Sequence, residues 1–140
     1  MISLLYVSRA AFPSGSADRS IAEILRSARV RNGAMEVTGA LLYLGGFFAQ
    51  VLEGEANDVN QLMIEILRDE RHRDVRIIEV GPIEGRRFSN WSMAWVPAAP
   101  GPRSYLETLT RRGSGAEAGA AAAALIDYMM RFADHPEASD

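Results

Sequence analysis

The stretch Gly45-Gly46-Phe47-Phe48-Ala49-Gln50-Val51-Leu52-Glu53 decides how this chain folds. A Gly-Gly pair between two apolar runs is typical of a β-hairpin turn, so it predicts strands at 36–44 and 47–53. Alternate residues of a strand share a face, which places Gln50 on the apolar side with Phe48 and Leu52. An unpaired buried amide costs roughly 1–3 kcal/mol. Gln50 therefore needs a polar partner: a hydroxyl, the backbone, water or a ligand edge.

The elements on either side of this hairpin predict the fold. We expect a strand at 2–8, a helix with apolar residues Ile21, Ile24, Leu25 and Ala28 that ends at Asn32-Gly33, a helix at 56–68, a strand at 75–80 and a short strand at 91–96. The order is then β-α-β-β-α-β-β. Two amphipathic helices in this order are best buried on a single face of one sheet. The sequence therefore predicts an α/β (α+β) ferredoxin-like sandwich with a mixed sheet.

The C-terminal third differs in composition. Residues 97–103 are proline-rich and predict a linker, and residues 104–134 predict a helical extension rich in alanine. We expect 135–140 to form a disordered tail. An apolar strip on the extension includes Leu125, Met129 and Met130. It packs either on the open face of its own sheet or on another protein, and the sequence leaves both interpretations open.

Composition excludes several classes of function. The 140 residues carry a net charge of −3 and no cysteine, which excludes disulfides and thiol catalysis and gives no basic surface for nucleic acid. The two histidines, His72 and His135, lie far apart, so we expect no metal site. There is no apolar run long enough to span a membrane, and we expect a cytoplasmic protein.

No nucleophile–base–acid set and no phosphate-binding glycine loop is visible. Glu53 and Glu55 flank Gly54 at a strand end, and we interpret them as parts of a solvated turn. Trp91 and Met93 are expected to alternate on one strand face, where core packing is the simplest role for them.

Taken alone, Tyr6 is most simply interpreted as a core aromatic residue and Asn32 as a helix-end residue. Taken together, Tyr6, Gln50 and the Trp91/Met93 pair come from three strands of one predicted sheet. The covering helices present Ile24 and Ile66 to that sheet. Such an apolar pocket with a few convergent polar groups suits a flat heteroaromatic cofactor.

At this point the chain resembles the BLUF family, blue-light sensors that bind flavin. The resemblance covers residues 1–96 and is carried by the segments 6–10, 27–39, 41–43, 48–54, 69–75 and 87–93. It implies a flavin-binding domain over 1–96 with non-covalent FAD, although FMN or riboflavin would also fit. It also implies a reversible photosensor without substrate turnover.

The resemblance further implies roles for single residues. Tyr6 would hydrogen-bond Gln50 and give an electron and a proton to excited flavin, and the Gln50 amide would then rotate or tautomerise. Trp91 and Met93 would change their packing after illumination. The flavin-binding residues that it implies are Tyr6, Ile24, Ser27, Arg29, Arg31, Asn32, Gln50, Ile66, Asp69, His72 and Met93.

Within that set, the resemblance implies that Ile24 and Ile66 clamp the ring and that Asn32 binds its edge. Arg29 or Arg31 would lie near the ribityl phosphate, and Asp69 and His72 near the far edge of the ring. Because no output domain is visible on the chain, the signal would pass to an unidentified downstream protein or through a homo-oligomer.

Two alternatives remain at this stage. An acylphosphatase-like small enzyme on the same fold would use Arg9 and Asn32 to hold an anion, although the loop 12–16 lacks a glycine-rich cradle. A flavin-free interaction module would fill the pocket with side chains or a metabolite.

Overall fold

A computed structural model describes residues 1–89, 91–97, 101–111 and 115–133. Its elements are β1 (Ile2–Ala10), the 3-10 turn η1 (Ser14–Ser16), α1 (Ala17–Ala34), β2 (Thr38–Leu44), β3 (Phe47–Gly54), α2 (Ala56–Arg68), β4 (His72–Pro82), β5 (Ala94–Val96), α3 (Arg103–Thr110) and α4 (Gly115–Phe132). The strands form one sheet in the order β4-β1-β3-β2-β5, in which only the β2–β5 pair is parallel. The expected ferredoxin-like sandwich with a mixed sheet is confirmed.

The hairpin between β2 and β3 sets the register of the sheet. Gly45 and Gly46 have φ values of 61° and 87°, as a two-residue hairpin turn with two left-handed positions requires. On the other side of β3, the antiparallel pairing with β1 places Tyr6 directly opposite Gln50. Two residues that are 44 positions apart in the chain are thereby brought side by side on the sheet.

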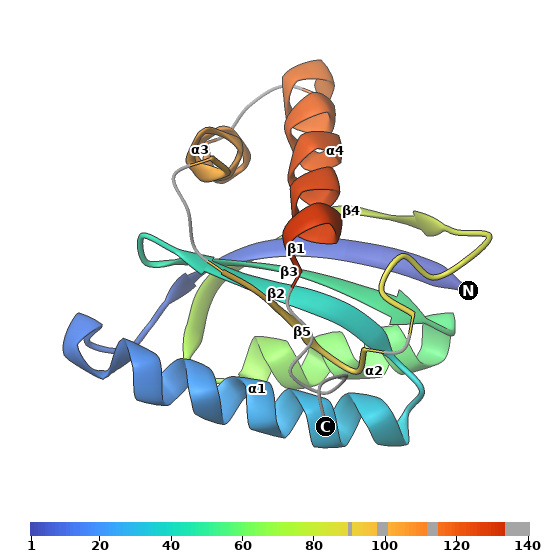
Figure 1. The fold of residues 1–140 in the computed structure, drawn as a ribbon, viewed down its shortest axis with the longest axis horizontal. Helices are drawn as coiled ribbons and strands as arrows, with labels where there is room; N and C mark the ends of the chain where they lie inside the picture. The colour runs from blue at the N-terminus through green and yellow to red at the C-terminus, as the bar shows by residue number, and fades with distance from the viewer. Residues whose placement is uncertain (90, 98–100, 112–114, 134–140) are drawn as a thin grey trace.

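Both faces of the sheet are covered by helices, as Figure 1 shows with α1 and α2 on one side and α3 and α4 on the other. We call the layer under α1 and α2 the first core and the layer under α3 and α4 the second core. Alternation along β1 sends Leu4 and Tyr6 to the first core and Leu5 and Val7 to the second.

The C-terminal helices settle the two interpretations of the apolar strip. Leu125 and Met129 are fully buried in the second core, so the strip packs on its own sheet. Met130 points away from it and is 45% exposed. The predicted tail 135–140 and part of the predicted linker lie outside the described residues. None of the helices in the described ranges has the length and apolar character needed to cross a membrane.

Helix α1 ends later than expected. It continues through Asn32-Gly33 to Ala34, and the left-handed position belongs to Glu36, with a φ of 56°. Asn32 is buried four residues after Ala28, so the apolar face of the helix extends for one more turn. The Asn32 carbonyl accepts from the backbone N–H of Val37 at 2.9 Å, which closes the helix without a glycine at that position.

The last strand also differs from the expectation. It spans only Ala94–Val96, and Trp91 and Met93 lie before it on opposite sides of the sheet. Trp91 packs against Phe88 in the second core with ring centroids 6.2 Å apart, whereas Met93 is buried in the first core. The prediction of one shared face was wrong because residues 91–93 are not extended strand, so the two-residue period does not apply to them.

Strand β4 begins at His72, three residues earlier than the expected strand at 75–80. The charged residues before position 75 look like a break, but β4 is an edge strand, where charged side chains face solvent. Its pairing with β1 shifts register twice, and Asp74 adopts a φ of 53° at one of these irregularities.

Candidate functional site

A buried hydrogen-bonded chain runs through Tyr6, Gln50 and Met93 in the first core. The Tyr6 hydroxyl donates to Gln50 Oε1, and Gln50 Nε2 donates to Met93 Sδ at 3.3 Å. The partner that Gln50 needs is therefore a phenol, supplied by the strand register. A primary amide has two N–H groups and two acceptor lone pairs, so these two bonds leave it capacity for a ligand.

The electrostatics of Tyr6 keep it a donor. The side chain is completely buried, and burial raises the pKa of its phenol well above the ordinary value, while Arg31 lowers that pKa and Asp69 raises it further. The phenol therefore holds its proton at any physiological pH. Loss of that proton needs a driving force other than pH.

His72 lies beside Tyr6 at the start of β4. Its Nδ1 is 3.0 Å from the Ser8 hydroxyl, and its ring meets the edge of Tyr6 and packs on Phe48. Burial lowers the pKa of His72 to about 4, although Asp69 acts in the opposite direction. The imidazole is therefore neutral at pH 7. Sequence reasoning missed Ser8, although its position two residues after Tyr6 puts it on the same strand face.

Asn32 carries a buried hydrogen-bond acceptor that has no partner within the described residues. It is fully buried in the last turn of α1, and its Nδ2 donates to the Ser92 carbonyl at 2.9 Å. Its Oδ1 is buried and has no hydrogen-bond partner within the described residues. A buried acceptor without a partner is unfavourable, so this oxygen fits a ligand that offers an N–H group. The ring edge of a flavin carries such a donor.

Two aliphatic side chains from facing helices complete the site. Ile24 of α1 and Ile66 of α2 are both buried in the first core. Helix α2 lies close against β1, β3 and β4, whereas α1 approaches none of the described strands as closely. Ile24, the expected clamp residue on α1, lies on the buried side of that helix. Arg29 of the same helix donates to the Met93 carbonyl at 3.1 Å.

Two expected flavin contacts on α1 have other partners in this structure. Ser27 is exposed, and its hydroxyl donates to the Glu23 carbonyl within the same helix at 2.9 Å. Arg31 Nε lies 3.5 Å from Glu65 of α2, so its guanidinium bridges the two helices. The structure does not bring Ser27 to the cluster around Tyr6.

Asp69 lies at the end of α2 and is held by Arg71. The Arg71 Nη2 and Nε atoms lie 2.7 and 2.9 Å from its two carboxylate oxygens. Burial alone would raise the pKa of the Asp69 carboxyl, but the hydrogen bonds and charge of Arg71 outweigh it and lower that pKa. Asp69 is thus an ionised group near the rim of the site.

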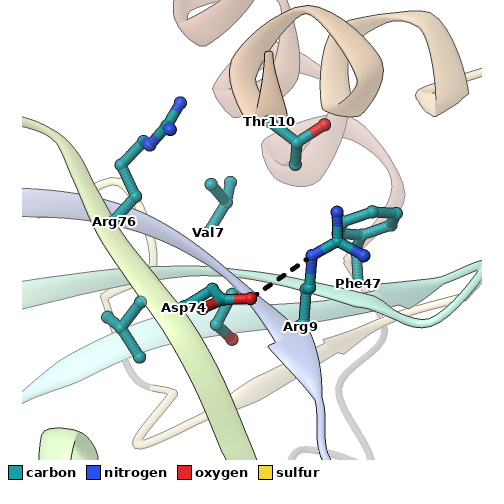
Figure 2. A pocket seen from close by; sticks show the side chains of 8 residues that line it. Val7, Arg9, Phe47, Asp74, Arg76 and Thr110 are labelled. Atoms are coloured by element: carbon teal, nitrogen blue, oxygen red, sulfur yellow. Dashed lines mark ion pairs between the residues drawn. The ribbon is translucent and has the colours of Figure 1, made fainter. Parts of the chain in front are cut away.

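Arg9 and Asn32 lie on opposite faces of the sheet. Arg9 lines a cavity of about 390 Å³ under α3, where it meets Asp74 at 3.5 Å and stacks over the Phe47 ring (Figure 2). Asn32 belongs to the first core. One anion cannot contact both side chains, so the acylphosphatase-like alternative is not favoured.

The prediction that Glu53 is part of a solvated turn was wrong. Its side chain is fully buried and accepts three hydrogen bonds from the chain. They come from the Thr38 hydroxyl at 3.0 Å and from the backbone N–H groups of Arg87 and Phe88 at 2.8 and 3.0 Å. Two of the donors lie more than thirty residues after Glu53 in the chain, so no local sequence pattern predicts the burial of its side chain.

Comparison with known proteins agrees with this geometry. A family model described as "Sensors of blue-light using FAD" matches residues 1–94. The photoactivated adenylate cyclase subunit alpha of Euglena gracilis is 40% identical over 90 residues, which are 64% of this chain and 9% of that protein. The subunit beta of Euglena longa is 36% identical over 94 residues, 66% of this chain and 11% of that protein. This chain thus spans about a tenth of those relatives.

Solved structures extend the likeness to almost the whole chain. The dark-state structure of BlrB, a BLUF protein, is 32% identical with a TM-score of 0.69, covering 94% of this chain and 92% of that one. The photo-activated state of BlsA has a TM-score of 0.74 at 23% identity, covering 89% and 94%, which shows a shared fold. With its family match over two thirds of its length and its buried tyrosine–glutamine pair, this chain belongs to the BLUF family of flavin-binding blue-light sensors.

Proposed function

We propose that Tyr6 and Gln50 are the photoactive pair of this sensor and that its flavin is FAD. The observation that carries the proposal is the buried chain from the Tyr6 hydroxyl through the Gln50 amide to Met93 Sδ. Each end of the amide has a different partner, so turning the amide over produces a different arrangement rather than the same one. The family description, which names FAD, supports the choice of flavin.

Bound flavin supplies the absorption of blue light and, once excited, an oxidant for a neighbouring phenol. Tyr6 would pass one electron from its ring and its hydroxyl proton to the excited flavin and would later recover both from it, so there would be no net oxidation. While the phenol lacks its proton, Gln50 Oε1 no longer receives a hydrogen bond from it. The amide is then able to rotate or tautomerise before the proton returns.

The altered Gln50 amide would present different donors and acceptors to a bound flavin, and this change in hydrogen bonding would move the flavin absorption to longer wavelength. In a dry interior each exchanged hydrogen bond has a larger electrostatic effect than it has in water. When the amide turns over, Met93 Sδ loses the hydrogen bond that it accepts from Gln50 Nε2. The proposed first consequence for the protein is therefore a displacement at Met93.

We propose that Asn32 Oδ1 accepts from the ring edge and that Ile24 and Ile66 lie against the two faces of the ring. The open valence of Asn32 and the burial of both isoleucines support this assignment. Arg29, Arg31, Asp69 and His72 are proposed contacts nearer the rim, with Ser27 requiring a rotamer change. Arg29 or Arg31 is the proposed contact of the ribityl phosphate.

We further propose that 1–96 is the flavin-binding domain, 97–103 a linker and 104–134 the output element, with no substrate turnover. The cover that α3 and α4 form over the second core supports a mechanical output. The downstream protein is unidentified, and exposed Met130 is a candidate contact for it or for a second copy. The cytoplasmic location stays a prediction.

Absorption spectroscopy of the flavin-loaded protein tests the proposal. Blue light should produce a red shift of the flavin band that reverses in the dark. Tyr6→Phe and Gln50→Leu should bind flavin and show no such shift, whereas Tyr43→Phe, a half-buried tyrosine of the same core, should behave as the natural protein does. A normal photocycle in either of the first two variants would contradict the assignment.

A further inference from the structure

We propose that Glu53 is a positioning residue: its carboxylate fixes the start of segment 88–93, so that a displacement of Met93 is passed to the second core. The proposal rests on the photosensor function above. Glu53 belongs to β3, the strand that carries Gln50, and lies three positions beyond it. The hydrogen bonds of the Glu53 side chain go to Thr38, Arg87 and Phe88 and not to Gln50 or Met93. Glu53 therefore acts through the backbone at the start of segment 88–93.

The anchoring of the segment at Glu53 has a definite geometry. The two carboxylate oxygens of Glu53 accept hydrogen bonds from the backbone N–H groups of Arg87 and Phe88 and from the Thr38 hydroxyl. The Arg86 guanidinium adds bonds to the Glu53 carbonyl and to the Thr38 hydroxyl, both at 3.0 Å. A carboxylate only accepts, so it suits a site that presents only donors. Such charge-assisted bonds are roughly twice as strong as neutral ones.

The other end of the segment is held from the first-core side. The Trp91 carbonyl accepts from the Gly39 N–H at 3.1 Å, and the Ser92 carbonyl accepts from Asn32. The Met93 carbonyl accepts from Arg29. Asn32 and Arg29 belong to α1 and are proposed flavin contacts, so this end lies next to the event that light triggers.

Between its two ends the segment connects the two cores. Met93 is buried in the first core beside Gln50, whereas Phe88 is buried in the second core with Trp91 packed against it. Met93 lies five positions after Phe88, so the length of chain that joins them is short. If the Phe88 end is fixed by Glu53, a shift at Met93 must be taken up by Trp91 and its contacts in the second core. If that end is loose, the loop before it absorbs the shift.

The substitution Glu53→Gln tests this directly. It keeps the size and one acceptor of the side chain but turns one oxygen into an N–H₂ group facing backbone donors, so at least one anchoring bond is lost. Thr38→Val removes only the hydroxyl bonds and keeps both backbone bonds, and its effect should be smaller. Glu55→Gln is the matched control, since Glu55 is exposed and makes no capping bond with its side chain.

The measurement uses the full chain loaded with FAD and labelled with 5-fluorotryptophan. The chain has two tryptophans, and Trp95→Phe assigns the Trp91 fluorine signal. For each variant, the red shift and the light-minus-dark change of the Trp91 signal are recorded on the same sample. In Glu53→Gln we expect an unchanged red shift and a Trp91 response reduced by at least half. Thr38→Val should show a partial reduction, and Glu55→Gln none.

Two results would overturn the proposal: a full Trp91 response in Glu53→Gln, or loss of the red shift there, which would make Glu53 part of the photochemistry. If Glu53→Gln fails to fold or to retain flavin, Thr38→Val decides, and an unchanged Trp91 response in it counts against the role. Failure of the proposed photosensor function is a different result: the protein with the natural sequence would then show no red shift at all.

Discussion

The two faces of the central sheet bury similar numbers of side chains but of different kinds. The first core contains polar groups among its apolar residues, including Tyr6, Gln50, Asn32 and His72, and each of them meets a specific partner. On the face under α3 and α4, the described buried polar side chains of the sheet are Ser3 and Glu53, which lie opposite each other at one end of β1 and β3, and the rest of the second core is apolar. Polar groups cost free energy in an interior unless they are paired, so a core that keeps them is built for a purpose other than stability.

The same strands build both cores, because neighbouring residues of a strand point to opposite faces. Val7 and Val51 of the second core are chain neighbours of Tyr6 and Gln50. The proposed photochemical residues and the proposed output helices are therefore separated by only the thickness of one sheet. Substitutions on the two faces should therefore have different effects on stability and on the photocycle, and the following experiments test that difference.

The largest effect on stability is expected in the second core. Leu125→Ala removes a fully buried side chain and should lower the free energy of unfolding by about 2–5 kcal/mol. Because Leu125 does not belong to the first core, the red shift should keep its normal size in the fraction that stays folded. Chemical denaturation with parallel difference spectra measures both. If the red shift decreases by more than the unfolded fraction explains, substitution in the second core also affects the photochemistry, and the expected difference between the two faces is wrong.

A pH dependence is expected from the first core. The pKa of His72 is about 4 in the folded protein against an ordinary value near 6.5, so the unfolded chain binds a proton between these values and the folded one does not. The free energy of unfolding should therefore fall by up to roughly 3 kcal/mol as pH drops from 6.5 to 4. It should be fully retained above that window. The nearby charges of Asp69, Arg71 and Arg31 modulate the size of this change.

His72→Gln isolates that dependence, because its difference from the natural protein removes the contribution of all other groups. Denaturation curves at several pH values should show the two proteins converging as pH falls toward 4. Parallel curves across the whole window would mean that His72 is not buried in its neutral form.

A smaller effect is expected for flavin affinity. Asn32→Leu removes the acceptor with the open valence, and a lost hydrogen bond of about 1.4 kcal/mol corresponds to a flavin dissociation constant about tenfold higher. Flavin titration followed by fluorescence quenching measures it. The exposed amide in Asn60→Leu provides the control and should leave the constant unchanged. Equal affinity in both variants would place the ring edge elsewhere in the first core.

Several features of the fold follow from local pattern. The glycine pair predicts the hairpin because two left-handed positions are needed there, and strand alternation then puts Gln50 with Phe48 and Leu52 on the side that proved to be the first core. The order of the elements predicts the ferredoxin-like sandwich. The resemblance adds a family, and with it proposed roles that no spacing in the chain could supply.

Other features depend on contacts between distant segments. The burial of Glu53 requires backbone donors from a loop that begins more than thirty residues later. The separation of Trp91 from Met93 arises because their segment is held by side chains of α1 rather than by a strand ladder. The end of α1 beyond Gly33 likewise depends on burial of Asn32, which only the assembled sheet provides.

The amino-acid sequence predicted the faces of β1 and β3, the hairpin and the type of sandwich, because turn chemistry and hydrophobic period act over a few residues. Tertiary structure decided that one acceptor of Asn32 lacks a partner and that Glu53 binds a distant loop, and it formed the contact between Tyr6 and Gln50 that the resemblance implied. The physical reason is that polar groups are buried only where another segment satisfies them, and that segment is chosen by the fold as a whole.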